Sequence, residues 1–421
     1  MESSVIHLIH QDRWDLLLRS LLHNKRLCLS LFRQDRLGRT PLHYACQKKG
    51  APAEVVRLLL ESARNWKDIW RLDTQGNTIL HMAAACGNAE VTKVVLQQRS
   101  ARYAWQLLSF VNHNQITPLR MAWYKHLVND RMRLFGDVDD HEVMLSPTVQ
   151  ENIHLLHRAR SVDDLLQDHY QDHPQQQQQA AADRLRDLWR KTHFICCTAS
   201  SSHGSNCAAQ GGGGGGGSQG SNSGGKTSFP LHTLTAVGGD HKVQCPTVAL
   251  WLATRLYPKE LSHRNPRGDL PLHIAASVPH EWRSIPQQTL QLLPVGANQP
   301  VLALMADAFP RAARIPDRRG RWAIHLAINA GKSFDTGMKR LIQAAPESLE
   351  TIDPVTKLYP FLQAASHDSR ATLTTVFELL CAKPDLVRPR QDNNDNKKQD
   401  EKEETDDDCT VMAHRRKRQK L

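Results

Sequence analysis

Residues 35–46 read DRLGRTPLHYAC, and this stretch decides the fold because the chain repeats it. Residues 73–84 read DTQGNTILHMAA, and the same frame returns less completely further along the chain. The later copies are NHNQITPLRMA from Asn112, NPRGDLPLHIAA from Asn265, DRRGRWAIHLAI from Asp317 and DPVTKLYPFLQAA from Asp353. Each copy begins with Asp or Asn and leads into an apolar segment, and most have Gly three residues after the start. Self-similarity at such intervals is the signature of a repeat protein.

The residues of the frame predict a turn followed by a helix. Glycine tolerates the positive φ of a tight turn, and proline suits the first position of a helix because its missing N–H would be unpaired there. A second segment with amphipathic helical spacing follows the first helix, as in EVVRLLLES from Glu54 and TVALWLATRLY from Thr247. One helical pair cannot bury its apolar face alone, so neighbouring pairs are expected to stack.

The frame resembles the ankyrin repeat, whose hallmark is T-P-L-H-x-A at a period of about 33 residues. Residues 35–46 match it in full and 73–84 nearly so, whereas later copies keep only P-L-H or I-H. A further unit is indicated at 228–257, where SFPLH supplies a helix start. The resemblance covers about 35–128 and 228–390. It implies an all-α, ankyrin-like helical-repeat solenoid.

Composition divides this chain of 421 residues into four predicted segments. Runs of glutamine at Gln175–Gln179 and of glycine at Gly211–Gly217 cannot bury enough apolar surface to fold. Helical periodicity nearby, at 148–169 and 181–195, predicts short helices that dock on the repeats. The predicted segments are 1–128 with a helical cap and the first ankyrin-like repeats, 129–227 as a low-complexity insertion with short helices, 228–390 with the remaining repeats, and 391–421 as a disordered charged tail.

Composition also limits the class of protein. The formal net charge is +11 and the mean hydropathy is −0.51. No stretch approaches the roughly 18 uncharged apolar residues that a membrane span requires, so no membrane association is predicted. Neither a secretory signal nor a transit peptide is evident at the N-terminus, and nine cysteines without framework spacing fit a reducing compartment. We therefore expect the chain in the nucleus, the cytoplasm or both.

The segment GSNSGGKT at 220–227 fits the phosphate-binding P-loop pattern G-x-x-x-x-G-K-[ST]. A P-loop needs a buried strand before it and a helix after it, so that backbone N–H groups face the phosphates. Here a glycine tract precedes the match and Pro230 follows closely. We interpret it as a chance match in a linker, and no cofactor is predicted.

The densest group of zinc-ligand residue types is His193, Cys196, Cys197, His203 and Cys207. Zinc sites usually pair cysteines as C-x(2-4)-C knuckles on a small scaffold. Adjacent cysteines in a Ser-rich setting do not form a knuckle. The end of a docked helix is the favoured interpretation, and no metal is predicted.

The repeat histidines His43, His81, His273 and His325 each follow an Asp or Asn by eight residues. Such a pair suggests acid–base chemistry, but an active site needs one constellation rather than several copies. The ankyrin resemblance implies that this His is a hydrogen-bonding group at the start of the first helix. We predict that the protein is not an enzyme and has no catalytic residues.

The tail ends in a basic run of Arg415, Arg416, Lys417, Arg418 and Lys420. On an accessible segment this run resembles a nuclear-import signal, which would make an importin-type receptor a partner. A solvating run of charge is the alternative.

The excess positive charge lies in the two repeat regions rather than in the insertion or the tail. Arginine suits bidentate contacts to carboxylate or phosphate. We therefore predict a non-enzymatic scaffold or adaptor that binds a protein partner, most simply an acidic one, through basic turn tips. A nuclear protein associated with chromatin or nucleic acid is the alternative. It is less favoured because the sequence has no zinc-finger or RNA-binding motif. The candidate partner-binding residues are Arg33, Arg36, Arg39, Arg264, Arg267, Arg318, Arg319 and Arg321.

Overall fold

The computed structural model divides the chain into two compact units, 1–376 and 377–421. The turn and first helix of every repeat lie in the first unit, and the boundary falls within the helix Arg370–Ala382, so the described part of the second unit holds the end of that helix and a short 3₁₀ segment. The described residues are 5–23, 33–63, 66–97, 100–128, 152, 176–203, 230–238, 243, 245–278, 296–297, 299–366 and 370–386.

Every element within the described residues is a helix, and most helices follow one another in pairs. The α-helices are α1 (Val5–His10), α2 (Trp14–His23), α3 (Pro41–Gln47), α4 (Ala53–Glu61), α5 (Trp66–Ile69), α6 (Ile79–Ala85), α7 (Ala89–Gln97), α8 (Ala101–Ser109), α9 (Pro118–Val128), α12 (Gln176–His203), α13 (Pro230–Gly238), α14 (Thr247–Leu256), α15 (Pro271–Ser277), α17 (Val301–Ala308), α18 (Ala323–Asn329), α19 (Met338–Ala344), α20 (Pro360–Ala365) and α21 (Arg370–Ala382). The 3₁₀ helices are η2 (Pro258–Ser262), η3 (Pro310–Arg314), η4 (Phe334–Thr336), η5 (Pro346–Glu350) and η6 (Pro384–Leu386).

The pairs stack by their first helices and by their second helices. First helix packs on first helix in α3–α6–α9 and again in α13–α15–α18–α20, and second helix packs on second helix in α4–α7 and in α14–α17–α19. Aliphatic side chains such as Leu59, Leu80 and Leu302 are almost completely buried in this stack. Each such burial contributes about 1.5–3 kcal/mol to stability. The all-α, ankyrin-like helical-repeat prediction is confirmed.

The first helices begin where the T-P-L-H frame predicts. Pro41 and Pro271 occupy the first turn of α3 and α15, where a missing N–H costs no hydrogen bond. Thr78 caps α6 by accepting a hydrogen bond on its hydroxyl from the backbone N–H of His81. A turn and a capped first helix are thus fixed by local residues, before any packing.

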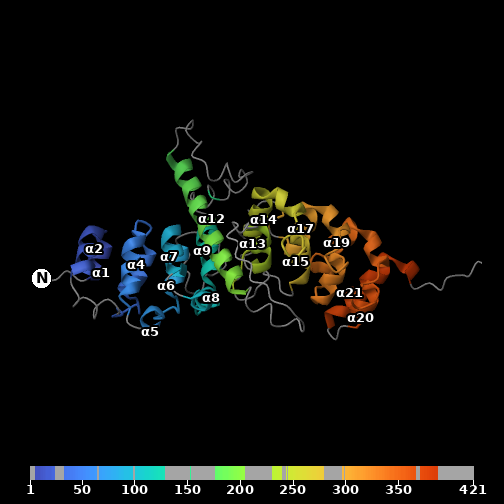
Figure 1. Cartoon of the computed structure of the whole chain (residues 1–421), viewed down its shortest axis with the longest axis horizontal. Coiled ribbons are helices and arrows are strands. Elements are labelled where there is room, and N and C mark those ends of the chain that lie inside the picture. Colours follow the sequence, from blue (N-terminus) through green and yellow to red (C-terminus); the bar gives the residue numbers. More distant parts are fainter. Residues whose placement is uncertain are drawn as a thin grey trace, which may run out of the picture. The chain divides into compact units, whose positions relative to one another are not determined.

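Helix α12 is the second helix of the pair that α9 begins, although it lies inside the range predicted as a low-complexity insertion. It packs on α9, on α7 of the preceding pair and on α13 of the next, and Figure 1 shows it running across these helices. Trp123 on α9 donates its indole N–H to Thr192 Oγ1 at 3.0 Å, and Trp189 and Ile195 are buried. Periodicity at 181–195 predicted a helix, and α12 confirms it. The boundaries of the four predicted segments stay a prediction.

Several other predictions fall mostly or wholly outside the described residues. These are the helix at 148–169 apart from Asn152, the P-loop-like match at 220–227 and the charged tail 391–421. Asn152 itself donates from Nδ2 to the His126 carbonyl on α9 at 2.9 Å. None of the helices in the described part of the chain combines the length and apolarity needed to cross a bilayer.

Candidate functional site: the turns between repeats

Each turn is built on the carboxylate or amide that opens the frame. Asp35 Oδ1 accepts the backbone N–H groups of Leu37 and Arg39, both at 2.9 Å, and the Asp35 N–H donates back to the Arg39 carbonyl at 3.0 Å. These bonds close the turn on itself and explain why a short Asp or Asn side chain is needed there. Side chains in the same role are Asp73, Asn112, Asn265, Asp317 and Asp353.

Glycine follows because the turn then passes through positive φ. The φ angles are +70° at Gly38 and +76° at Gly76, and residues that have a Cβ atom rarely adopt this backbone conformation. A Cβ on Gly76 would also lie 2.6 Å from His113 Cδ2, inside the next turn. Gln115 and Lys357 take the same conformation without being glycine.

Successive turns are hydrogen-bonded to one another. The Thr74 N–H donates to the Leu37 carbonyl at 2.9 Å. Gln34, just before the first Asp, donates from Nε2 to the carbonyls of Gly38 and Leu72 at 2.6 and 2.9 Å, and so spans two turns. The turns therefore form a connected edge rather than separate loops.

Four histidines, namely His81, His232, His273 and His325, tie a first helix to the turn that follows in the stack. Nδ1 of His81 accepts the Thr78 N–H at 3.2 Å, so the ring proton resides on Nε2, which donates to the Ile116 carbonyl at 3.0 Å. The same Nε2 contact recurs at His232, His273 and His325. Burial lowers the pKa of His43 and His81 to about 4, so both rings are neutral at neutral pH. These contacts agree with the structural role predicted for the histidines.

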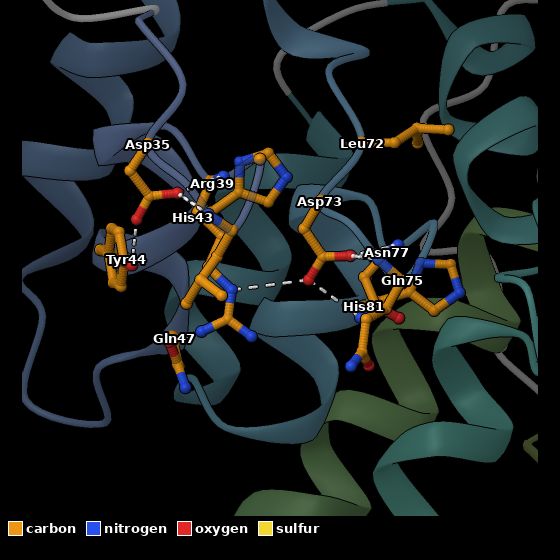
Figure 2. A network of polar contacts seen from close by, with 12 residues as sticks. Asp35, Arg39, His43, Tyr44, Gln47, Leu72, Asp73, Gln75, Asn77 and His81 are labelled. Carbon is orange, nitrogen blue, oxygen red and sulfur yellow. Dashed lines mark hydrogen bonds and ion pairs between the residues drawn. The ribbon is translucent and has the colours of Figure 1, made fainter. Parts of the chain in front are cut away.

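Three of the eight candidate arginines are held by contacts within the fold, although one of them, Arg264, is itself exposed. Arg39 reaches across to the next turn, with Nε 3.5 Å from Asp73 Oδ2 (Figure 2). Arg321 places both Nε and Nη2 3.1 Å from Asp317 Oδ2 within its own turn. Arg264 donates to the carbonyls of Gly268 and Pro316 at 2.6 and 2.8 Å, which is the role of Gln34 in the first turn.

The remaining candidates are exposed at the turns. They are Arg33, Arg36, Arg267, Arg318 and Arg319. The carboxylates of Asp35, Asp73, Asp317 and Asp353, in contrast, accept backbone N–H groups within their turns. Burial opposes ionisation of Asp317, but the N–H groups of Arg321 and Arg319 and the Arg321 charge hold its pKa below its usual value. Internal acids and external arginines make the exposed edge positive.

The Cys/His group predicted near the end of α12 contains His193, Cys196 and Cys197. Cys196 is buried, and Cys197 Sγ lies 3.6 Å from His193 Nε2 on the preceding turn of the helix. Across the described residues, no group of three or more His, Cys, Asp or Glu side chains is arranged to hold a metal ion. Side-chain positions of His203 and Cys207 lie outside the described part, as do the tail residues Arg415–Lys420.

Sequence reasoning missed two features of this edge. Arg120 occupies the histidine position of the third copy, the one that begins at Asn112, and it is half-buried on α9. In the last turn, the aliphatic side chains of Ile352 and Val355 are 48% and 53% exposed. The sequence held one sign that the last turn differs, which is the extra residue in DPVTKLYP. This residue lengthens the turn: the Asp353 N–H donates to the Leu358 carbonyl, five residues on, whereas the Asp35 N–H donates to the Arg39 carbonyl, four residues on.

Comparison with known proteins assigns part of this architecture. Residues 15–106 match the family of ankyrin repeats (3 copies). No curated protein matches the chain.

Proposed function

We propose that the chain, an ankyrin-repeat protein, is a non-enzymatic scaffold or adaptor that holds an acidic partner protein on the arginines of its turns. Ankyrin repeats are modules of protein–protein interaction, and binding residues on a rigid scaffold concentrate in its loops. Partner identity depends on the side chains that each turn exposes, because a repeat fold by itself does not fix function.

One observation carries the proposal: exposed arginines stand on turns that are fixed by internal hydrogen bonds. Arg36 directly follows Asp35, and Arg318 and Arg319 directly follow Asp317. The carboxylates of these two aspartates close the turns that carry the arginines. A side chain on a fixed backbone loses less conformational entropy on binding than one on a mobile loop. Exposed arginines also accelerate encounter with an acidic surface.

The experiment is affinity purification of the full chain with quantitative mass spectrometry. In the test variant Arg36, Arg267, Arg318 and Arg319 are changed to Glu. Arg39 and Arg321 stay unchanged, because reversing them would break the contacts with Asp73 and Asp317. The matched control reverses four exposed cations that lie outside the turns, namely Arg102, Lys259, Arg311 and Lys339.

We expect acidic partners to be recovered with the control variant and lost with the turn variant. Recovery should also fall as salt concentration rises, because exposed charges are screened. Unchanged recovery of every partner with the turn variant would overturn the proposal.

The non-enzymatic part of the proposal is supported by the use of the histidines. The same ring geometry recurs in successive repeats, with Nδ1 and Nε2 both bonded to backbone groups at His81, His273 and His325. A catalytic base needs a nitrogen that faces a substrate.

Chromatin or nucleic-acid association is the second candidate, favoured by the same exposed arginines. Its test is binding of the full chain to random duplex DNA at several salt concentrations. A protein that neutralises several phosphates loses affinity steeply with salt, with a slope close to the number of contacts. Weak binding with little salt dependence would eliminate this candidate.

The basic run at Arg415–Lys420 supports a further part of the proposal, which is import into the nucleus by an importin-type receptor. We propose that the chain is found in the nucleus, the cytoplasm or both. A fluorescent fusion of the full chain should lose nuclear signal when Arg416, Lys417 and Arg418 are changed to Ala. An unaltered distribution would leave the run as a solvating segment.

A further inference from the structure

The last three turns of the array form one contiguous strip, which we name the C-terminal edge: residues 264–269, 316–321 and 352–358. Arg264 Nη2 donates across the first gap to the Pro316 carbonyl at 2.8 Å. A Cβ on Gly268 would lie 3.1 Å from Arg318 Cβ, and one on Gly320 would lie 3.3 Å from Pro354 Cγ. A ligand at this edge therefore meets three adjoining turns.

The exposed charged side chains of the C-terminal edge are cations, and Asp269 within it is half-buried. Arg267, Arg318, Arg319 and Lys357 are exposed. Asp353 is buried, with Oδ1 bonded to the Val355 N–H at 2.9 Å and Oδ2 to Gln363 Nε2 at 3.2 Å. Asp317 is similarly buried and paired with Arg321. Carboxylates that build the turns thus do not neutralise the cations outside.

Apolar surface lies beside these cations. Ile352 and Val355 flank the exposed Pro354, and Pro354 is the residue that Gly320 approaches in the arginine-bearing turn. Several exposed apolar side chains gathered in one turn beside charged ones are typical of an interaction surface. The first turn offers less: Leu37 is 50% exposed beside Arg36, without a second exposed aliphatic side chain in its turn.

We infer that the C-terminal edge binds a linear acidic segment of a partner protein in which aliphatic or aromatic residues alternate with carboxylates. This inference rests on the proposed function and specifies its ligand and its place. Carboxylates of the segment pair with Arg318 and Arg319, and its apolar side chains cover Val355 and Ile352. Charge gives fast encounter, and apolar burial adds affinity that salt does not screen.

The test uses the full chain as bait for a phage-displayed library of random linear peptides. We expect the enriched peptides to contain both Asp or Glu and aliphatic or aromatic residues. Binding of a synthesised enriched peptide should weaken at least about tenfold in the double variant Arg318→Glu/Arg319→Glu, and severalfold in Val355→Ser. Such losses correspond to the removal of charged and apolar contacts worth about 1–2 kcal/mol each.

The matched control is Arg33→Glu/Arg36→Glu, which makes the same change of charge at the first turn. It should leave binding of the enriched peptide within about twofold. Circular dichroism and thermal unfolding of each variant show that the fold is retained, as expected for exposed side chains.

Other outcomes separate this inference from the proposed function. If the enriched acidic peptides depended on Arg33 and Arg36 instead, the assignment of the binding site to the C-terminal edge would be overturned, while the proposed function would be supported. Acidic peptides without apolar residues, unaffected by Val355→Ser, would overturn the apolar part of the inference. Enrichment of peptides without carboxylates, or insensitivity to both double variants, would overturn the inference and the proposed function together.

Discussion

The first turns of the array and the last ones share a scaffold but expose different side chains. In both, an Asp closes the turn, and neutral histidines such as His81 and His325 tie a first helix to the following turn. At the first turn Arg39 crosses to Asp73, whereas at the later turn Arg321 pairs with its own Asp317 and leaves Arg318 and Arg319 exposed. The difference teaches that the frame residues are architecture, and that function has to be sought in the residues between them.

The largest expected effect is a loss of stability in acid at the N-terminal repeats, where the pKa values of the repeat histidines are lowered most. Burial lowers the pKa of His43 and His81 to about 4, and it lowers the pKa of His273 and His325 as well. The unfolded chain takes up protons near pH 6.5 whereas the folded chain does not, so stability falls as pH drops from about 6.5 towards 4. At pH 4 the loss amounts to about 3 kcal/mol for each of the two N-terminal histidines, since one pKa unit is about 1.4 kcal/mol.

Hydrogen exchange followed by mass spectrometry at decreasing pH checks this expectation region by region. Protection in 35–97 should decline between pH 6.5 and 4.5, and above pH 7 it should not change. The variant His43→Gln/His81→Gln should show a smaller dependence on pH in this window. Equal protection of 35–97 at pH 7 and pH 4.5 would contradict buried neutral histidines.

A second prediction compares two glycines with similar φ but different surroundings. Gly76 (φ +76°) approaches His113 so closely that an added Cβ would overlap it, whereas Gly331 (φ +70°) has no atom within 4 Å of that position. Gly331→Ala should cost about 1 kcal/mol from the backbone conformation alone. Gly76→Ala should cost about 2–3 kcal/mol, because the next turn must also shift. Denaturant unfolding measures both, and equal costs would show that the turns are not packed on each other.

Much of this scaffold could be predicted from the sequence, because it depends on contacts within a few residues. The Asp35 turn, the proline at the start of α3 and the position of His43 follow from local spacing. Arg39 could not be assigned in the same way, since its partner Asp73 lies in another repeat. Spacing along the chain shows which arginines recur at turns, but not which of them the fold uses internally.

Helix α12 shows a second limit. It begins in the glutamine run at Gln176, far along the chain from the end of α9 at Val128, so the interrupted pair does not look like a repeat. Burial of Trp189 and Ile195 arises from packing on α7, α8, α9 and α13. The periodicity of 181–195 indicated a helix, and only tertiary contacts show that this helix completes the pair that α9 begins.

A third prediction concerns the internal arginines. Arg321 presents two nitrogens to Asp317 Oδ2 at 3.1 Å, whereas Arg39 approaches Asp73 with one nitrogen at 3.5 Å; all four side chains are largely buried. Arg321→Gln should therefore cost about 1–2 kcal/mol and Arg39→Gln about 1 kcal/mol. Thermal unfolding of the two variants checks the order. If Arg321→Gln left the stability of the fold unchanged, the Arg321 charge would be available to a partner after all.

The smallest expected effect on stability belongs to the exposed arginines, and it completes the contrast between scaffold and surface. Arg318→Glu/Arg319→Glu and Arg33→Glu/Arg36→Glu should each change the free energy of unfolding by less than about 0.5 kcal/mol, since these guanidinium groups are exposed. Denaturant unfolding measures this directly. A loss comparable to that of Arg321→Gln would place Arg318 or Arg319 in the scaffold and remove it from the partner-binding edge. A negligible change, together with altered partner recovery, separates the residues that hold the turns from those that the turns present.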